Sequence, residues 1–203
     1  MKRPLFHVHR LTEASIQEAL EFQEHRPNQP SATLRQSIFL AKRLAGIGDN
    51  VNERWDIILL VREPVACAIS AYFQSIDRWF PSLMDTFQEG RTDIPVLIQT
   101  FLDKYSHDWP LSWFDKQIRQ TLGVNVYQSE FDRVKGFSIH RGDLANVLVL
   151  RLENIDSSAK NALETFLNTT IIDLVNANVA ESKDYAQIYR RFKTEIRLPR
   201  QLS

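Results

Sequence analysis

The sequence predicts an α/β fold of three layers, in which a central parallel sheet lies between helices. Two continuous apolar runs, residues 57–61 and 147–150, are typical of strands that are covered on both faces. Stretches with helical periodicity alternate with these runs, as they do in α/β proteins. A length of 203 residues suits one core. We therefore expect residues 1–203 to form a single domain.

The first part of the chain predicts a strand and two helices. Residues 5–10 alternate weakly between apolar and polar, which is typical of a short strand. Thr12 is a candidate cap for the helix that follows. A second helix is expected to begin near Ser31, with Gly46 and Gly48 at its exit. These elements precede the first buried strand.

The run at 57–61 is the candidate central strand. Arg62 and Glu63 follow it, and then comes Pro64. Proline suits the first position of a helix because its missing N–H would have no partner there. Apolar residues at helical spacing continue this predicted helix as far as Ile76.

The rest of the chain continues the alternation of helices and strands. Helices are predicted at 94–105, 111–122 and 158–168, strands at 124–127 and 147–150, a hairpin or loop at 133–146, and a basic surface helix within 183–200. The tryptophans are expected to serve mostly in core packing.

Composition limits the classes of function. Lysine and arginine balance aspartate and glutamate at 25 each, so no overall charge favours nucleic acid or an anionic membrane surface. No apolar run is long enough for a transmembrane helix and no secretory signal opens the sequence, so we expect a soluble, cytoplasmic protein. The single cysteine, Cys67, excludes an internal disulfide, and we expect it to be a small core residue.

Arg62 and Ser70 are the first candidate site residues. An arginine at the carboxyl end of a central strand lies where open α/β sheets bind ligands, and its guanidinium can bind phosphate through two parallel hydrogen bonds. Ser70 lies six residues beyond Pro64 and shares a helix face with Ala66, where small side chains leave room for a ligand. The alternative is structural: Arg62 pairs with a surface carboxylate and Ser70 packs against a helix.

The stretch Leu-Val-Arg-Glu-Pro at 60–64, with Ser70 eight residues after the arginine, resembles a sulfotransferase motif. That motif binds the 3′-phosphate of PAPS (3′-phosphoadenosine 5′-phosphosulfate), the sulfuryl donor. Glu63 stands where the family usually has aspartate. The resemblance implies the three-layer, P-loop-NTPase-like sulfotransferase fold, with Arg62 and Ser70 as phosphate ligands and PAPS as co-substrate.

Further segments resemble a bacterial branch of this fold, the capsular polysaccharide synthesis proteins. These segments are residues 113–115, 123–127, 131–132 and 136–137. Asn178, Lys183 and Tyr185 are similar to an asparagine, lysine and tyrosine signature of that branch. The resemblance implies a nucleotide donor, a carbohydrate acceptor, and a role for Lys183 and Tyr185 in closing over one of them.

His7 and His9 are the second candidate site. Alternate residues of a strand face the same side, and a neutral histidine is a suitable general base for a sugar hydroxyl. A similar His-x-His supplies the base in the uronyl 2-O-sulfotransferases, so the resemblance makes His7 the first candidate and His9 the second. An ordinary pair of partly buried histidines is the alternative. No other histidine has the spacing that would complete a zinc site, so no metal is expected.

One part of the sulfotransferase pattern is missing. These enzymes hold the 5′-phosphosulfate in a loop of basic, glycine and Ser/Thr residues between the first strand and the first helix, and no such run precedes His7. Residues 46–48 and 135–138 are poor substitutes. The resemblance thus implies a chain that begins one strand and one helix late, or a degenerate homologue. The rival functions are a non-catalytic remnant that binds an anion or partner and another nucleotide-binding α/β enzyme.

Overall fold

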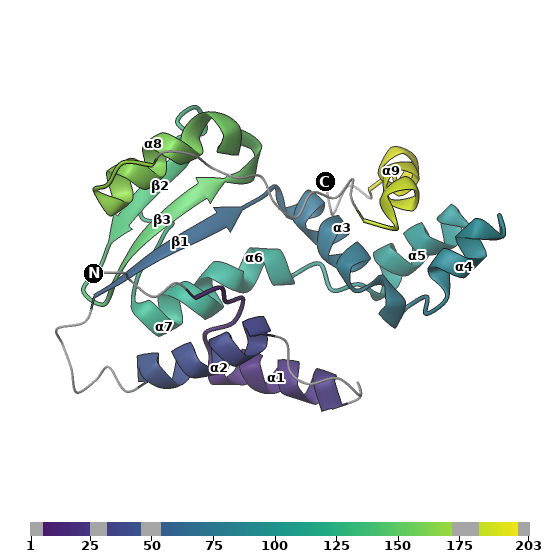
Figure 1. The fold of residues 1–203 in the computed structure, drawn as a ribbon, viewed down its shortest axis with the longest axis horizontal. Coiled ribbons are helices and arrows are strands. Elements are labelled where there is room, and N and C mark those ends of the chain that lie inside the picture. Colours follow the sequence, from purple (N-terminus) through teal and green to yellow (C-terminus); the bar gives the residue numbers. More distant parts are fainter. Residues whose placement is uncertain (1–5, 25–31, 46–53, 172–182, 199–203) are drawn as a thin grey trace. The chain divides into compact units, whose positions relative to one another are not determined.

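Two helices precede the first strand, a run of helices separates it from a pair of consecutive strands, and helices follow that pair, so helices and strands alternate less regularly than the sequence predicts (Figure 1). The computed structural model describes residues 6–24, 32–45, 54–171 and 183–198. The chain divides into two compact units, Met1–Val61 with Ser112–Thr170 and Arg62–Leu111 with Ile171–Ser203. Each unit is described by itself.

The first unit contains the sheet. Its elements are α1 (Glu13–Glu24), α2 (Ala32–Ala45), β1 (Trp55–Val61), the π-helix η3 (Phe114–Arg119), which continues from α6 (Trp109–Trp113) and leads into α7 (Gln120–Leu122), β2 (Phe137–Arg141), β3 (Ala145–Arg151), the 3₁₀ turn η4 (Leu152–Asn154) and α8 (Ile155–Leu167). The predicted helices at 111–122 and 158–168 are confirmed, and each begins two or three residues earlier than expected.

The sheet is mixed, not parallel as predicted. Its strand order is β1-β3-β2, with β1 parallel and β2 antiparallel to β3. A tight hairpin joins β2 to β3, in which the N–H of Gly142 donates to the carbonyl of Ala145. Two strands linked by so short a connection can only run antiparallel. The predicted hairpin within 133–146 is therefore confirmed, and it accounts for the mixed sheet.

The central strand is β3 and not the run at 57–61. Every residue from Ala145 to Leu150 is buried, so the predicted strand at 147–150 is confirmed with both faces covered. In β1 burial alternates, and Ile58 and Leu60 keep 39% and 61% of their surface exposed. Among the described strands β1 lies at an edge, because the sheet has no strand beyond it. The continuous apolar run at 57–61 thus predicted a strand correctly but predicted its position in the sheet wrongly.

Helices cover both faces of this sheet, which gives the unit three layers (Figure 1). On one face, side chains of β2 and β3 pack against Ala162 and Phe166 of α8. On the other face, Val147 and Val149 pack with Ile118 of η3 and Leu40 of α2. The predicted α/β class and its helix, sheet and helix layers are confirmed within this unit.

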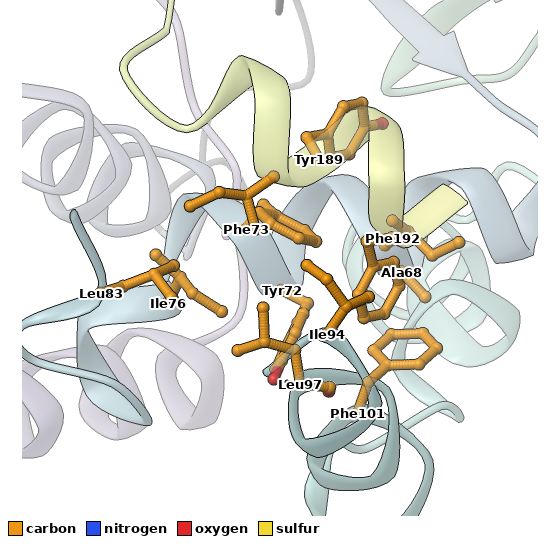
Figure 2. Packing of buried hydrophobic residues seen from close by; sticks show 12 residues of the cluster. Ala68, Tyr72, Phe73, Ile76, Leu83, Ile94, Leu97, Phe101, Tyr189 and Phe192 are labelled. Carbon is orange, nitrogen blue, oxygen red and sulfur yellow. Dashed lines mark hydrogen bonds between the residues drawn. The ribbon is translucent and has the colours of Figure 1, made fainter. Parts of the chain in front are cut away.

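The second unit is helical. Its elements are α3 (Pro64–Gln74), the 3₁₀ turn η2 (Ile76–Arg78), α4 (Leu83–Gln88), α5 (Ile94–Lys104) and α9 (Ala186–Glu195). The predicted helices after Pro64, at 94–105 and within the basic tail are confirmed, whereas α4 was not predicted. Figure 2 shows how side chains of α3, α5 and α9 form one aromatic core. Phe192 of α9 contacts Tyr72, Phe73 and Phe101 edge-on or tilted, at centroid distances of 5.1 to 5.9 Å.

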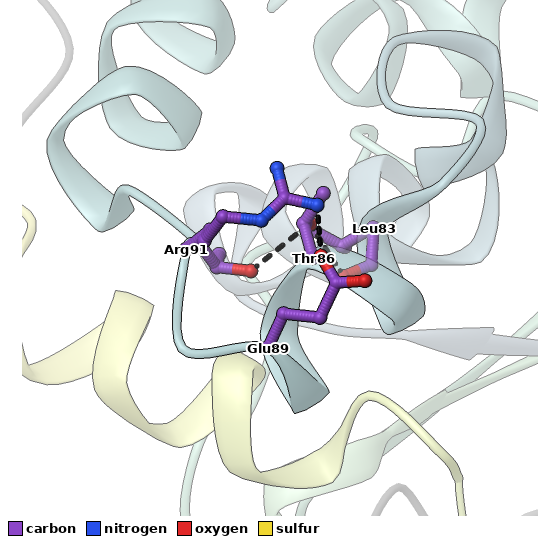
Figure 3. A network of polar contacts seen from close by, with 5 residues as sticks. Leu83, Thr86, Glu89 and Arg91 are labelled. Atoms are coloured by element: carbon purple, nitrogen blue, oxygen red, sulfur yellow. Dashed lines mark hydrogen bonds and ion pairs between the residues drawn. The ribbon is translucent and has the colours of Figure 1, made fainter.

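A polar turn connects α4 to α5 (Figure 3). The hydroxyl of Thr86 donates to the carbonyl of Leu83, and the carbonyl of Thr86 accepts from the N–H of Arg91. Glu89 and Arg91 form an ion pair. Gly90, between them, has a φ of +69°, which is the left-handed conformation that glycine adopts without strain.

Two predicted strands are wrong. Residues 6–11 form no strand, and residues 124–127 lead into a turn. Asn125 explains the second case, because its side-chain oxygen accepts the N–H of Tyr127 and its carbonyl accepts the N–H of Gln128. Local bonds of this kind compete with strand pairing.

No helix in the described part of the chain is long and apolar enough to cross a membrane.

Candidate functional site

Arg62 and Ser70 lie on the same unit, at and beside α3. Arg62 immediately precedes the helix cap and Ser70 lies in the second turn of the helix. Both side chains are half-buried, and so is Ala66, one turn before Ser70. Tyr72 is buried on the opposite face of α3, and Phe73, which is also buried, lies one turn from Ser70. The helix therefore has a core face and a second face of small side chains that reaches solvent.

Cys67 lies close to both Arg62 and Ser70. Burial raises the pKa of the Cys67 thiol, the positive charge of Arg62 opposes that shift, and the charge of Glu63 adds to it. Arg62 is thus close enough to act on the thiol, and Ser70 is the neighbour of Cys67 one turn along the helix. The three side chains lie along one side of α3.

Neither Arg62 nor Ser70 is committed to another residue within the described ranges. The guanidinium makes no ion pair there and the hydroxyl makes no hydrogen bond. The structural alternative, in which Arg62 pairs with a surface carboxylate, therefore has no support in this part of the chain. A guanidinium and a hydroxyl with free donors suit a phosphate group.

The N-terminus of α3 is occupied by a side chain of the protein itself. The two carboxylate oxygens of Glu63 accept the N–H groups of Val65 and Ala66 at 2.9 and 2.7 Å. Pro64 stands at the first helical position, as the sequence predicts. Because Glu63 binds these free N–H groups, an anion on this side of α3 would depend on side chains and not on the helix terminus.

Tyr185 and Lys183 stand at the start of α9. The ring of Tyr185 packs on Phe73 of α3 at 5.6 Å and lies 6.5 Å from the ring of Tyr189. Burial, and secondarily the neighbouring Tyr189, raises the pKa of the Tyr185 phenol. Lys183 is exposed. Arg62, Ser70 and Tyr185 are therefore all grouped about α3, while Asn178 lies outside the described residues.

His7 and His9 stand side by side on the first unit. Their ring centroids are 4.9 Å apart, in an edge-on arrangement. Partial burial lowers the pKa of His9, and the charges of His7 and Arg10 lower it further. The neutral form, which can accept a proton, is thereby favoured. The alternate spacing placed the rings together although the segment is not a strand, and their catalytic role stays a prediction.

Side chains from two helices hold the histidine segment. Gln36 of α2 accepts the N–H of His7 at 2.7 Å, and the indole N–H of Trp113 donates to the carbonyl of His9 at 3.2 Å. Gln117 of η3 accepts the N–H of Leu11 at 2.6 Å. Gln36 and Gln117 were not predicted as part of the site. The available signal was a glutamine beside Ile118 on the apolar face of a predicted helix.

The structure gives no support for residues 46–48 or 135–138 as the phosphosulfate loop. Residues 46–48 lie outside the described ranges. Gly136 has a φ of +75°, and a Cβ on it would come within 2.5 Å of the Cβ of Asn154. Its carbonyl accepts the N–H of Arg151. Gly136 thus serves the close approach of the chain to the start of α8. In the described part of the chain, no three histidine, cysteine or carboxylate residues gather as metal ligands do.

The comparisons with known proteins give one match. A family model described as "Putative capsular polysaccharide synthesis protein" matches residues 85–203, which is more than half of the chain. The matched region begins within α4 and covers α5, η3, the β2–β3 hairpin, α8 and α9. No curated protein and no solved structure matches the chain significantly.

Proposed function

Because the chain belongs to this family of capsular polysaccharide synthesis proteins, we propose that it is a carbohydrate sulfotransferase of capsular or exopolysaccharide biosynthesis. The family description indicates polysaccharide biosynthesis. Sulfuryl transfer from PAPS to a polysaccharide hydroxyl is the finer proposal. It rests on the residues of α3 and on the histidine pair.

The observation that carries the proposal is the pair formed by Arg62 and Ser70. Both are half-buried, both are neighbours of Cys67, and neither is bound to another described residue. A guanidinium with two parallel donors and a hydroxyl one helix turn from Ala66 fit a phosphate group without rearrangement of the core face. We assign them to the 3′-phosphate of the nucleotide. Lys183 and Tyr185 are assigned to its outer contacts.

Bound PAPS would supply the sulfuryl group, which is attached to a good leaving group. The residues of the chain then have to hold the nucleotide and remove the proton of the acceptor hydroxyl. His7 is the first candidate for this base and His9 the second. The neutral state of His9, favoured by partial burial, supports a base near pH 7. The two parts of the proposal lie in different units and are tested separately.

Calorimetric titration with adenosine 3′,5′-bisphosphate (PAP) tests the first part. A charge-assisted hydrogen bond contributes about 1.5–3 kcal/mol, so Arg62→Ala should weaken PAP binding by about tenfold or more. Arg78→Ala removes the same charge from an exposed position of the same unit and should leave the affinity unchanged. Equal affinity of wild type and Arg62→Ala would remove the assignment.

A non-catalytic anion-binding protein is the second candidate. The observation that favours it is that no strand in the described part of the chain is followed by a run of basic, glycine and Ser/Thr residues. Such a protein would bind PAP through Arg62 but transfer no sulfate from PAPS to any carbohydrate. Transfer of labelled sulfate to a glycan, abolished by His7→Ala or by the double variant with His9→Ala, would decide for the enzyme.

A further inference from the structure

The segment that carries His7 and His9 forms neither helix nor strand, bends at His9 and has no partner strand among the described residues. Side chains take the place of that strand. The backbone groups bound are the N–H of His7, the carbonyl of His9 and the N–H of Leu11, at alternate residues. Side chains from two helices thus bind the backbone of the segment at three positions.

Gln117 makes the most of these contacts. Its side-chain oxygen accepts the N–H of Leu11 at 2.6 Å, the N–H of Thr12 at 3.2 Å and the hydroxyl of Ser15 at 3.2 Å. Its amide nitrogen lies 3.4 Å from the hydroxyl of Thr12. Gln117 is 95% buried, and its oxygen joins the end of the histidine segment to the first turn of α1.

The π-helix explains how a glutamine reaches this position. The N–H of Gln120 donates to the carbonyl of Asp115, five residues back, which widens the turn by one residue. Ile118 and Leu122, four residues apart, pack in the sheet core, and the neighbouring Gln117 is buried against the histidine segment. The widened turn therefore lets neighbouring residues of one helix pack in the sheet core and bind the histidine segment. Trp113, one turn earlier, adds the bond to the carbonyl of His9.

We propose that Gln117, supported by Trp113, is a positioning residue that fixes the histidine segment and thereby the orientation of His7 and His9. Its catalytic consequence rests on the proposed function, whereas its structural part does not. A general base acts only within hydrogen-bond reach of its proton, so a segment released at Leu11 would lose the alignment of both rings.

The donors around Gln117 allow a sharp choice of variants. Every close contact of its oxygen is with a donor, so Gln117→Glu keeps an acceptor in place, at the N-terminus of α1, where negative charge is favoured. Gln117→Met keeps the approximate shape and removes the acceptor. Gln120→Met is the matched control, since Gln120 is an exposed glutamine of the same helix.

Nuclear magnetic resonance tests the proposal. In Gln117→Met we expect the amide protons of Leu11 and Thr12 to exchange with solvent about tenfold faster or more. These amides lose their acceptor, so they become accessible through local opening without global unfolding. The midpoint of the His9 titration should move toward the ordinary histidine value as the ring is released from its partial burial. The charges that act on His9, those of His7 and Arg10, are unchanged in this variant. Gln117→Glu should keep the slow exchange, and Gln120→Met should match wild type.

The outcomes are separable from the proposed function. Unchanged exchange and an unchanged His9 titration in Gln117→Met would overturn the positioning role, and so would a Gln117→Glu variant that behaves like Gln117→Met. Should Gln117→Met not fold, Trp113→Phe takes its place, because it removes the donor to the carbonyl of His9 together with part of the indole ring, and an unchanged His9 resonance there would overturn the proposal. PAP affinity should be equal in all these variants, so loss of the PAP assignment leaves this test standing.

Discussion

At the scale of single residues, burial decides which groups keep their ordinary chemistry. Cys67 is half-buried, and burial raises the pKa of its thiol in spite of the nearby Arg62. A thiol is a weak nucleophile until it ionises. Cys67 is therefore a thiol that stays protonated on the partly exposed side of α3, and not the enclosed core residue that the sequence predicts.

His140 offers a test of burial through pH. Burial lowers the pKa of His140, whose ring nitrogen Nε2 lies 2.9 Å from the hydroxyl of Ser138. The unfolded chain then binds the proton more tightly than the folded one, so folding stability is lost as pH falls below the unfolded value of about 6.5. Urea midpoints measured between pH 7.5 and 5 should fall more steeply for wild type than for His140→Gln. Parallel profiles would show that His140 titrates alike in both states.

At the scale of elements, the start of α3 is set by its cap residue and its first residue. Glu63 caps the helix with both carboxylate oxygens and Pro64 begins it. Proline has no N–H to leave unpaired at this position. The local sequence therefore sets where α3 begins, and with it the position of Ser70 relative to Arg62.

Removal of this cap should destabilise the fold without touching the core. Glu63→Ala leaves the N–H groups of Val65 and Ala66 to solvent and should lower the free energy of unfolding by about 0.5–2 kcal/mol. Glu63→Gln retains one acceptor oxygen and should lose less. Chemical denaturation of the three proteins measures both effects, and equal stability of all three would mean that the cap does not stabilise α3.

The helix α9 depends on its apolar face. Phe192 is fully buried against Tyr72, Phe73 and Phe101, as Figure 2 shows. Phe192→Ala should therefore cost about 3–5 kcal/mol, because it leaves a cavity among aromatic rings. Arg190→Ala, on the exposed side of the same helix, should change stability by about 0.5 kcal/mol or less. A loss for Phe192→Ala no larger than for Arg190→Ala would place α9 outside the core in solution.

Helices were predictable at this scale because their signals are local. Periodicity and the start signals Thr12 and Pro64 each act within one or two turns, and so does Gly123, which ends α7 in a left-handed conformation. Strands at 5–10 and 124–127 were predicted wrongly for the opposite reason. Pairing depends on distant partners, and in both segments side chains such as Gln36 and Asn125 bind the backbone that a strand would have used.

At the scale of the whole molecule, the sequence predicts layers better than strand order. The apolar runs identified β1 and β3, and helices do cover both faces of the sheet. Which run is central depends on pairing across about ninety residues, and neither run carries that information. The residues that carry each candidate site could be proposed from spacing because His7 with His9 and Arg62 with Ser70 are close in sequence. Gln117 could not, because it lies more than one hundred residues from the segment it holds.

The most direct test of the central claim is a double-mutant cycle of PAP binding with Arg62→Ala, Ser70→Ala and the double variant. Two groups that hold one phosphate should show a coupling free energy of about 0.5 kcal/mol or more, and adenosine 5′-phosphate, which lacks the 3′-phosphate, should show none. Additivity within about 0.3 kcal/mol, or equal coupling for both nucleotides, would contradict a shared phosphate site at Arg62 and Ser70.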